Sequence, residues 1–215
     1  MNKYKVVEKF VSVDGEGIRV GYPVVFIRLA GCNLSCKYCD SLYANDNPKY
    51  EVMTTQQILD YIISTGFKMV TLTGGEPLIH PGIETLIDTL IANNFDVNIE
   101  TNGAVDIQDI NENALITMDY KCPSSGMEDK MLLDNFDYLN STDVLKFVVG
   151  SQEDLLKAKE IIEKYNIECE IFFSPVFGDI EPKEIVKFII DNKMQNVRMQ
   201  LQIHKFIWNP LKRGV

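Results

Sequence analysis

The sequence predicts an α/β fold, an incomplete TIM-type barrel of mainly parallel strands, in a single domain spanning residues 1–215. Short β-branched runs alternate with amphipathic helical patterns along the whole chain. Such alternation favours a parallel sheet with helical crossovers. The chain has 215 residues, whereas a complete eight-stranded barrel takes roughly 250 residues. No repeat, low-complexity tract or linker-like segment divides it.

The predicted elements alternate in the order that this fold requires. Runs rich in β-branched residues predict strands at 5–13, 24–29, 69–73, 96–100, 115–120, 144–149, 169–173 and 197–203. Helical patterns predict helices from Thr54 or Thr55 to Ser64, from about Pro81, from Ser151 to Tyr165, and from Pro182 to Asn192. A threonine hydroxyl can cap the first helix, and Pro182 suits a first helical position because the missing N–H has no helical partner there.

Composition and charge narrow the class of protein. The formal net charge of −10 argues against nucleic-acid binding, which needs clustered lysine and arginine. The longest apolar runs, such as 185–190, are too short to cross a bilayer, and residues 1–10 mix charges into their apolar residues, unlike a signal peptide. We therefore expect a cytoplasmic protein that does not bind membranes. In a reducing compartment, five cysteines favour metal or catalytic use.

Three cysteines stand at CxxxCxxC spacing directly after a predicted strand. Cys32, Cys36 and Cys39 can converge on one metal centre, and thiolates are the usual ligands of iron–sulfur clusters. Three ligands would leave one iron of a four-iron cluster open to a small molecule. A structural zinc site is an alternative, although it needs a fourth ligand and neither histidine lies at finger-like spacing. Three unrelated buried cysteines are the other alternative.

Two motifs together resemble the radical S-adenosylmethionine superfamily. The cysteine loop carries the typical aromatic residue, Tyr38, before its last cysteine, and a Gly74-Gly75-Glu76-Pro77 turn ends a later strand. Paired glycines let backbone approach a ligand closely, and Glu76 can accept from an ammonium group. The resemblance implies a radical SAM core, a [4Fe-4S] cluster on the three cysteines, and cleavage of S-adenosylmethionine to methionine and a 5′-deoxyadenosyl radical.

Further segments resemble the 7-carboxy-7-deazaguanine synthase family along the whole chain. They are Phe10–Gly17, Phe26-Ile27-Arg28 and Cys39-Asp40-Ser41. The resemblance implies a carbon–nitrogen lyase that converts 6-carboxy-5,6,7,8-tetrahydropterin to 7-carboxy-7-deazaguanine with loss of ammonia, in queuosine biosynthesis. It also implies Mg²⁺, a homodimer, and flavodoxin or another low-potential electron donor.

The same resemblance assigns roles to individual residues. It implies that substrate is bound by Val13, Asp14, Gly15, Glu16, Arg28, Thr73, Gln202, His204, Pro210 and Val215, of which Glu16, Arg28 and His204 are the catalytic candidates. It implies that S-adenosylmethionine is held by Tyr38, Cys39, Asp40, Gly74, Gly75, Glu76, Lys121, Pro123, Ser124 and Ser125. Ser41 would bind Mg²⁺, a hard cation that prefers oxygen.

Simpler interpretations stand beside these roles. Glu16 and Arg28 could form a surface ion pair, Asp119 and Lys121 could belong to a solvated strand face, and His204 could be a hydrogen-bonded histidine on an apolar strand. We expect Cys122 and Cys169 to serve in packing. The sequence departs from the family in two places: Asp14 replaces the usual glutamine, and Ser41 replaces the commoner threonine.

Two other functions remain open from the sequence. One is an activase that installs a glycyl radical on a partner protein, because residues 14–19 nearly reproduce an Asp-Gly-x-Gly-Ile-Arg string of that group. Glu16 at the variable position and the Cys-Asp-Ser ending count against it. The other is a non-enzymatic zinc or iron–sulfur module, for which the Gly-Gly-Glu-Pro turn would have no purpose.

Overall fold

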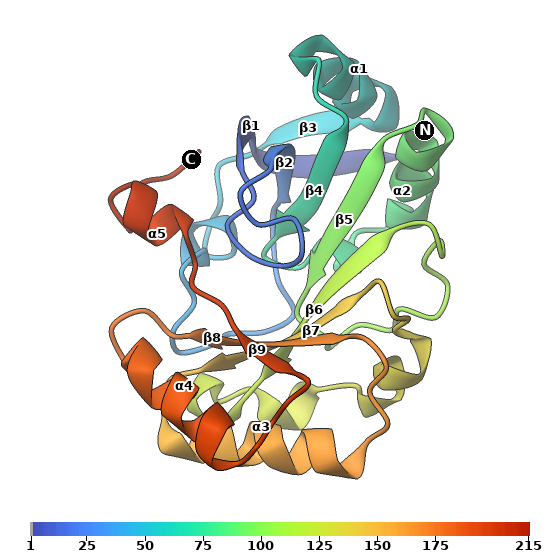
Figure 1. The fold of residues 1–215 in the computed structure, drawn as a ribbon. Helices are drawn as coiled ribbons and strands as arrows, with labels where there is room; N and C mark the ends of the chain where they lie inside the picture. Colours follow the sequence, from blue (N-terminus) through green and yellow to red (C-terminus); the bar gives the residue numbers. More distant parts are fainter. Residues whose placement is uncertain (1) are drawn as a thin grey trace.

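One curved sheet of nine strands organises the molecule. The computed structural model describes residues 2–215. Its strands run in the order β3-β1-β2-β4-β5-β6-β7-β8-β9, and the two end strands do not pair with each other, so the barrel is open. All pairings from β2 to β9 are parallel, while β1 pairs antiparallel with both β2 and β3. This arrangement confirms the predicted partial barrel of mainly parallel strands (Figure 1).

The bounds of the elements follow the predicted order. The strands are β1 (Lys3–Val13), β2 (Pro23–Leu29), β3 (Glu51–Thr54), β4 (Met69–Gly74), β5 (Asp96–Thr101), β6 (Leu115–Lys121), β7 (Val144–Val149), β8 (Glu170–Pro175) and β9 (Val197–Met199). The α-helices are α1 (Thr55–Thr65), α2 (Ile83–Ala92), α3 (Gln152–Lys164), α4 (Pro182–Asp191) and α5 (His204–Ile207). Short 3-10 turns cover Leu42–Ala44, Pro77–Ile79, Pro123–Ser125, Glu128–Lys130 and Leu133–Tyr138.

Helices α1 to α4 lie outside the curved sheet (Figure 1), and buried apolar residues of these helices and of the strands form the core. The first helix begins at the predicted threonine, because the Thr54 hydroxyl accepts from the Gln57 amide and the Gln57 side chain accepts from the Thr54 amide. The predicted apolar stripe of α2 is buried. Along the central strands, every second residue joins this core, which leaves the alternate side chains facing the concave side of the sheet.

One predicted strand is too long, and one observed strand was not predicted. The strand predicted at 197–203, which is β9, ends at Met199; the Gln200 amide still donates to the Phe173 carbonyl of β8, while the Gln200 side chain bonds both the N–H and the carbonyl of Gly17. His204 is consequently not on a strand but is the first residue of α5. The edge strand β3 was not predicted, since two of its four residues, Glu51 and Val52, are exposed and give no alternating pattern.

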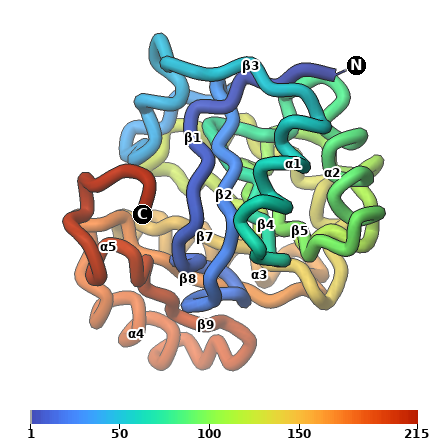
Figure 2. The backbone as a smooth tube through the Cα atoms, turned by 90° about the horizontal axis from the view of Figure 1, so that it is seen from above, coloured from blue at the N-terminus to red at the C-terminus, as the bar shows by residue number. Residues whose placement is uncertain are grey.

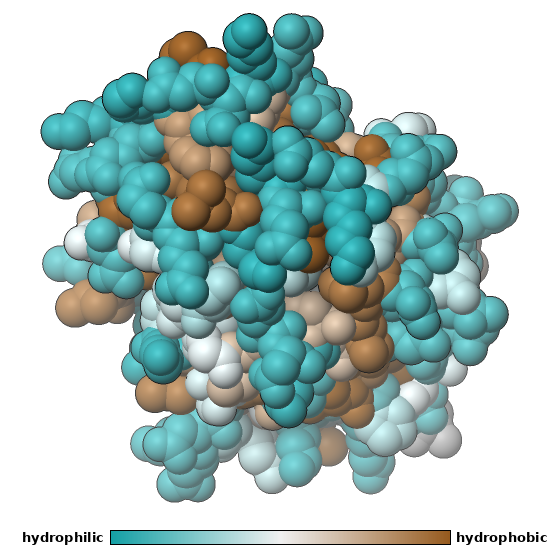
Figure 3. Space-filling view, turned by 90° about the horizontal axis from the view of Figure 1, so that it is seen from below, coloured by the Kyte–Doolittle hydropathy of each residue, from teal (hydrophilic) through white to brown (hydrophobic). Residues whose placement is uncertain are grey.

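The C-terminal segment returns to the start of the chain. In the view from above, residues 204–215 lie beside β1 and the loop that follows β2 (Figure 2). The face seen from below is mainly hydrophilic, with hydrophobic residues in separate patches (Figure 3). Within residues 2–215, no helix combines the length and the apolarity that crossing a bilayer requires.

Candidate active site

The concave side of the sheet is polar. The residues that alternate with the core positions on β4 to β7 include Thr71, Thr73, Asn98, Glu100, Thr117, Asp119, Lys121 and Lys146. Ligands of parallel α/β sheets bind at the carboxyl ends of the strands. The predicted cysteine loop follows β2, the glycine turn follows β4, and the loop 122–125 follows β6, so the fold brings all three to that end.

The cysteine loop is held by backbone contacts rather than by regular structure. The Cys39 amide donates to the Cys36 carbonyl at 3.2 Å, and the Lys37 amide donates to the Ser125 carbonyl at 3.0 Å. Burial raises the pKa of the Cys36 thiol, and the neighbouring Cys39 and Cys32 raise it further. All three cysteines are partly exposed and free.

This donor set fits an iron–sulfur cluster. Among residues 2–215, no three His, Cys, Asp or Glu side chains are spaced to share a single metal ion. A four-iron cluster does not require such spacing, because each thiolate binds a different iron. The Leu34 amide and the Asn102 side chain each point a donor at Cys32 Sγ, both at 3.4 Å. Donors of this kind favour the thiolate form that ligation needs.

The glycine turn lies directly against the cysteine loop. A methyl group on Gly74 would lie 2.3 Å from the Leu29 carbonyl oxygen, and one on Gly75 would lie 2.2 Å from that of Gly31. The Glu76 amide donates to the same Gly31 carbonyl at 2.8 Å. Only glycine fits at both positions, because the end of β2 and the start of the cysteine loop pack directly against the backbone of the turn.

Glu76 itself is fully buried, and its carboxylate is engaged within the chain. Its oxygens accept from the Leu78 amide at 3.0 Å, the Thr101 hydroxyl at 3.0 Å and the Asn102 amide at 2.6 Å. The side chain therefore joins the glycine turn to the end of β5. Despite these donors, burial dominates and raises the pKa of Glu76 to about 7.

The raised pKa of Glu76 makes stability depend on pH. The folded state binds the proton more tightly than the unfolded state, whose pKa is 4.5, so the stabilisation is present below that value and is lost as pH rises through about 7. We expect the free energy of unfolding to fall between pH 5 and 7 more steeply in the wild type than in Glu76→Gln, by up to about 3 kcal/mol. Urea denaturation across this range measures the difference. The exposed Glu84 of α2 gives the control Glu84→Gln, which should retain the wild-type slope; an equal slope in Glu76→Gln would show that Glu76 stays ionised throughout.

An alternating chain of charges runs along the concave face. Lys121 Nζ lies 2.7 Å from Asp119 Oδ2, Lys146 Nζ lies 2.9 Å from Asp119 Oδ1, and Lys146 Nζ also lies 3.1 Å from Glu16 Oε2. Burial alone would lower the pKa of Lys146, but Asp119, Glu16 and Glu100 outweigh it and hold the pKa above its usual range. Asp119 and Lys121 are thus paired in the barrel interior, and the alternative of a solvated face is wrong.

Two carboxylates on the 14–16 loop each keep one free oxygen. Asp14 is 1% exposed; its Oδ2 accepts from the Thr71 hydroxyl at 3.2 Å, while Oδ1 is buried with no partner. Glu16 Oε1 is likewise buried with no partner. A buried acceptor without a donor is costly, so these two oxygens mark where a ligand's N–H or O–H groups would be accepted.

Arg28 takes its position from β1 and the 3-10 turn after the cysteine loop. Its Nε donates to Glu8 Oε2 at 3.3 Å, its Nη1 donates to the Gly74 carbonyl at 3.3 Å, and the Tyr43 hydroxyl donates to the same Glu8 oxygen at 3.0 Å. The predicted alternative of a surface ion pair between Glu16 and Arg28 is wrong, because the two side chains have different partners.

The C-terminal segment closes over two loops of the site. Ile203 N donates to the Gly15 carbonyl at 3.1 Å, and His204 packs so tightly on Gly15 that a methyl group there would lie 2.0 Å from Nδ1. Lys205 Nζ lies 3.0 Å from Asp40 Oδ2. The guanidinium of Arg213 lies 3.8 Å from the centre of the Tyr43 ring.

The remaining predicted residues differ in how directly they face the site. Ser124 donates twice to Asp154 and the buried Ser125 donates to the Cys122 carbonyl, so both side chains shape the loop that supports Lys37. Ser41 has one weak contact, 3.5 Å to Asp40. Among residues 2–215, no side-chain hydrogen bond or ion pair involves Gln202, Pro210 or Val215. Cys122 and Cys169 are buried in the core as predicted.

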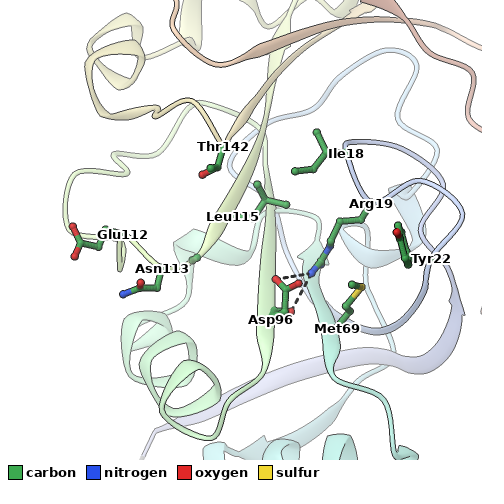
Figure 4. Close-up of a pocket in the computed structure, with 10 residues that line it drawn as sticks. Ile18, Arg19, Tyr22, Met69, Asp96, Glu112, Asn113, Leu115 and Thr142 are labelled. Atoms are coloured by element: carbon green, nitrogen blue, oxygen red, sulfur yellow. Dashed lines mark hydrogen bonds and ion pairs between the residues drawn. The ribbon is translucent and has the colours of Figure 1, made fainter.

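A cavity of about 440 Å³ lies at the other end of the sheet. It is lined by the first residues of β4, β5 and β6, and Arg19 crosses it to bond the Asp96 carbonyl and carboxylate (Figure 4). Arg19 also donates to the Val70 carbonyl and the Thr71 hydroxyl. The Arg19 guanidinium therefore occupies the end of the barrel at which the parallel strands begin, opposite to the end that carries the cysteines.

Several residues of the site were not predicted. Lys146 stands alone in an otherwise apolar strand, and such a charge needs a buried partner, which is a usable signal. Four further residues belong to the site only because they contact residues distant in sequence: Glu8, Tyr43, Asn102 and Gln200. Nothing local distinguishes them.

Comparison with known proteins gives a consistent result. The model of the Radical SAM superfamily matches residues 26–189, which is more than half of the chain. The chain is 54% identical to 7-carboxy-7-deazaguanine synthase of Clostridium acetobutylicum, with 99% of each covered, and 41% identical to that of Methanospirillum hungatei, with 96% of this chain and 86% of the relative covered. The crystal structure of QueE from Escherichia coli superposes with a TM-score of 0.77 at 25% identity, covering 93% of both chains.

Proposed function

The chain belongs to the radical SAM superfamily and, within it, to the 7-carboxy-7-deazaguanine synthase family, and we propose that it converts 6-carboxy-5,6,7,8-tetrahydropterin to 7-carboxy-7-deazaguanine with loss of ammonia. The observation that carries this proposal is the convergence of the cysteine loop, the glycine turn and the polar concave face at one end of the sheet. When bound, the cluster and S-adenosylmethionine supply the radical that removes a hydrogen atom from the substrate.

Residues of the 13–16 loop would bind the pterin ring. The unpartnered oxygens of Asp14 and Glu16 are suited to accept ring N–H groups. Burial raises the pKa of Asp14, while the Arg19 guanidinium, 3.7 Å from Asp14 Oδ2, acts in the opposite direction. Val13, Gly15 and Thr73 would contribute contacts around these groups.

Arg28 would bind the substrate carboxylate, and His204 would contact the substrate beside the 13–16 loop. The planar guanidinium of Arg28 suits a carboxylate through paired N–H donors, and its attachment to Glu8 and to the Gly74 carbonyl holds it beside the glycine turn. His204 lies against Gly15, next to the proposed pterin contacts. Gln202, Pro210 and Val215 would act through the closing C-terminal segment.

The cofactor would lie between the cysteine loop and the end of β6. Gly74 and Gly75 would contact the cofactor through their backbone, and Tyr38 donates its hydroxyl to the Val148 carbonyl at 3.4 Å. Lys121 is the last residue of β6, so it would border the cofactor at this end of the sheet. Asp40 and the 121–125 loop would complete this side, with Ser124 and Ser125 acting mainly by holding the loop.

Mg²⁺ would bind at Ser41. The hydroxyl makes only one weak contact, and the Asp40 carboxylate is its neighbour, so oxygen donors of the type that Mg²⁺ prefers are present. Flavodoxin or another low-potential donor would reduce the cluster, and we also propose that the chain forms a homodimer, which sedimentation of the cluster-loaded protein can measure.

Pterin-dependent cofactor cleavage by this protein alone tests the proposed function. We expect 6-carboxytetrahydropterin to increase the consumption of S-adenosylmethionine under anaerobic, reducing conditions with no other protein substrate present. A protein that needs a large protein partner, and ignores the pterin, would instead be a glycyl-radical activase.

We expect Arg28→Ala to weaken substrate binding and to leave substrate-free cofactor cleavage intact. Losing a hydrogen-bonded charge pair costs about 1.5–3 kcal/mol, so KM should rise about 10- to 100-fold. Steady-state kinetics and a substrate-free cleavage assay measure the two effects. Arg198→Ala, which removes an exposed arginine paired with Glu170, should change neither. Loss of substrate-free cleavage in Arg28→Ala would place Arg28 at the cofactor instead.

A further inference from the structure

An asparagine amide is fixed against one of the three cluster cysteines. Asn102, at the end of β5, is 6% exposed, and its Nδ2 lies 3.4 Å from Cys32 Sγ and 2.8 Å from Asn33 Oδ1. Its Oδ1 accepts from the Ala104 amide at 2.9 Å. Because a backbone N–H occupies the oxygen, the NH₂ group is the one that faces the sulfur.

A second amide stands beside another cysteine. Asn45 Nδ2 lies 3.8 Å from Cys39 Sγ, and Asn45 packs so closely on Gly75 that a methyl group there would lie 1.9 Å from Oδ1. The longer distance makes this the weaker of the two contacts. Cys36 accepts no comparable amide among the hydrogen bonds of the described residues, so the donors are distributed unequally over the three sulfurs.

Hydrogen bonds to cluster sulfurs affect the reduction potential in a defined direction. Reduction adds negative charge to the cluster and its thiolates, and a donor stabilises the more negative state more strongly. A rigid, buried donor does this most effectively, because it loses no further entropy and is not replaced by water. Asn102 meets this condition, since its oxygen and its backbone N–H, which donates to Glu76 at 2.6 Å, are both engaged.

We propose that Asn102 is a positioning residue that raises the reduction potential of the cluster by donating to Cys32, and that Asn45 adds a smaller effect through Cys39. The two asparagines thereby make the cluster easier to reduce by a given donor. The effect concerns the cluster alone, so it holds whichever pterin the protein accepts.

A potentiometric titration followed by EPR tests the proposal on the full-length, cluster-loaded protein without substrate. We expect Asn102→Leu, which removes the donor without adding charge, to lower the equilibrium constant for one-electron reduction at least tenfold, equivalent to 59 mV. Asn102→Asp keeps the acceptor for Ala104 and adds a negative charge, so its potential should fall at least as far. Asn45→Leu should lower the potential by less than Asn102→Leu.

Asn135 supplies the matched control. It is a buried asparagine whose Nδ2 donates to the Val105 carbonyl and whose Oδ1 accepts from Ile107, so it braces the same loop without touching a cysteine. Asn135→Ala should keep the wild-type potential. The potential does not depend on the fraction of protein that carries a cluster. Unchanged potentials in both Asn102 variants would overturn the proposal, and so would a failure of both to load a cluster, because Asn102 would then act in assembly.

Discussion

We expect the replacement of Cys36 with alanine to abolish both cluster assembly and turnover. The three cysteines are the only thiols in the loop that follows β2, and a cluster bound by two thiolates lacks the third protein ligand that leaves a single iron open. The other two cysteines of the chain lie in the core and cannot substitute. We expect Cys36→Ala to lose the visible absorption of the cluster, most of its iron, and all cofactor cleavage after anaerobic reconstitution.

Cys169→Ala provides the control for this experiment. Cys169 is 7% exposed and packs in the core beside β8, so its removal changes packing and leaves the cysteine loop intact. We expect this variant to load as much iron as the wild type and to cleave S-adenosylmethionine. Cofactor cleavage retained by Cys36→Ala would contradict the assignment of the loop.

Replacing Lys146 with methionine destabilises the fold by about 3–5 kcal/mol, the usual cost of removing one partner from a buried ion pair. Lys146 is 5% exposed and is the shared cation of Asp119 and Glu16. Methionine has a similar length but no charge, so the two carboxylates would lose their counter-ion in the barrel interior. Urea denaturation of the anaerobic, cluster-loaded protein measures the loss as a shift of the midpoint.

A second substitution shows whether charge causes this loss. Adding Glu16→Gln to Lys146→Met removes one of the unpaired charges, so the double variant should be less destabilised than the sum of the two single variants. Lys187→Met, which removes an exposed lysine paired with Asp191, should cost less than about 1 kcal/mol. A strictly additive double variant would mean that Lys146 contributes by packing and not by pairing.

Local periodicity explains how much of this architecture is predictable. The alternation of apolar residues places strands β4 to β8 and helices α1 to α4 within a few residues of their positions, because strand and helix patterns are read from neighbours in sequence. The cysteine loop and the glycine turn are contiguous motifs, so they too can be recognised from the chain alone. The parallel order then brings them to one end of the sheet.

Contacts between distant segments explain what could not be predicted. The Gln200 side chain bonds the backbone of Gly17 and the Ile203 amide donates to the Gly15 carbonyl, so residues 200–204 lie against the segment 15–17. The link from Arg28 through Glu8 to Tyr43 joins three separate segments. Glu76 was expected to face an ammonium group, yet it lies buried among donors of its own chain. Such partners depend on the tertiary fold, which no local pattern encodes.

Identification of the reaction product is the most direct test of the proposed conversion of the pterin to the deazapurine. The reconstituted protein would be incubated anaerobically with dithionite, S-adenosylmethionine, Mg²⁺ and 6-carboxytetrahydropterin, and the products would be identified by mass spectrometry. We expect 7-carboxy-7-deazaguanine together with released ammonia. Formation of 5′-deoxyadenosine with no deazapurine, from protein verified to carry its cluster, would contradict the proposed conversion.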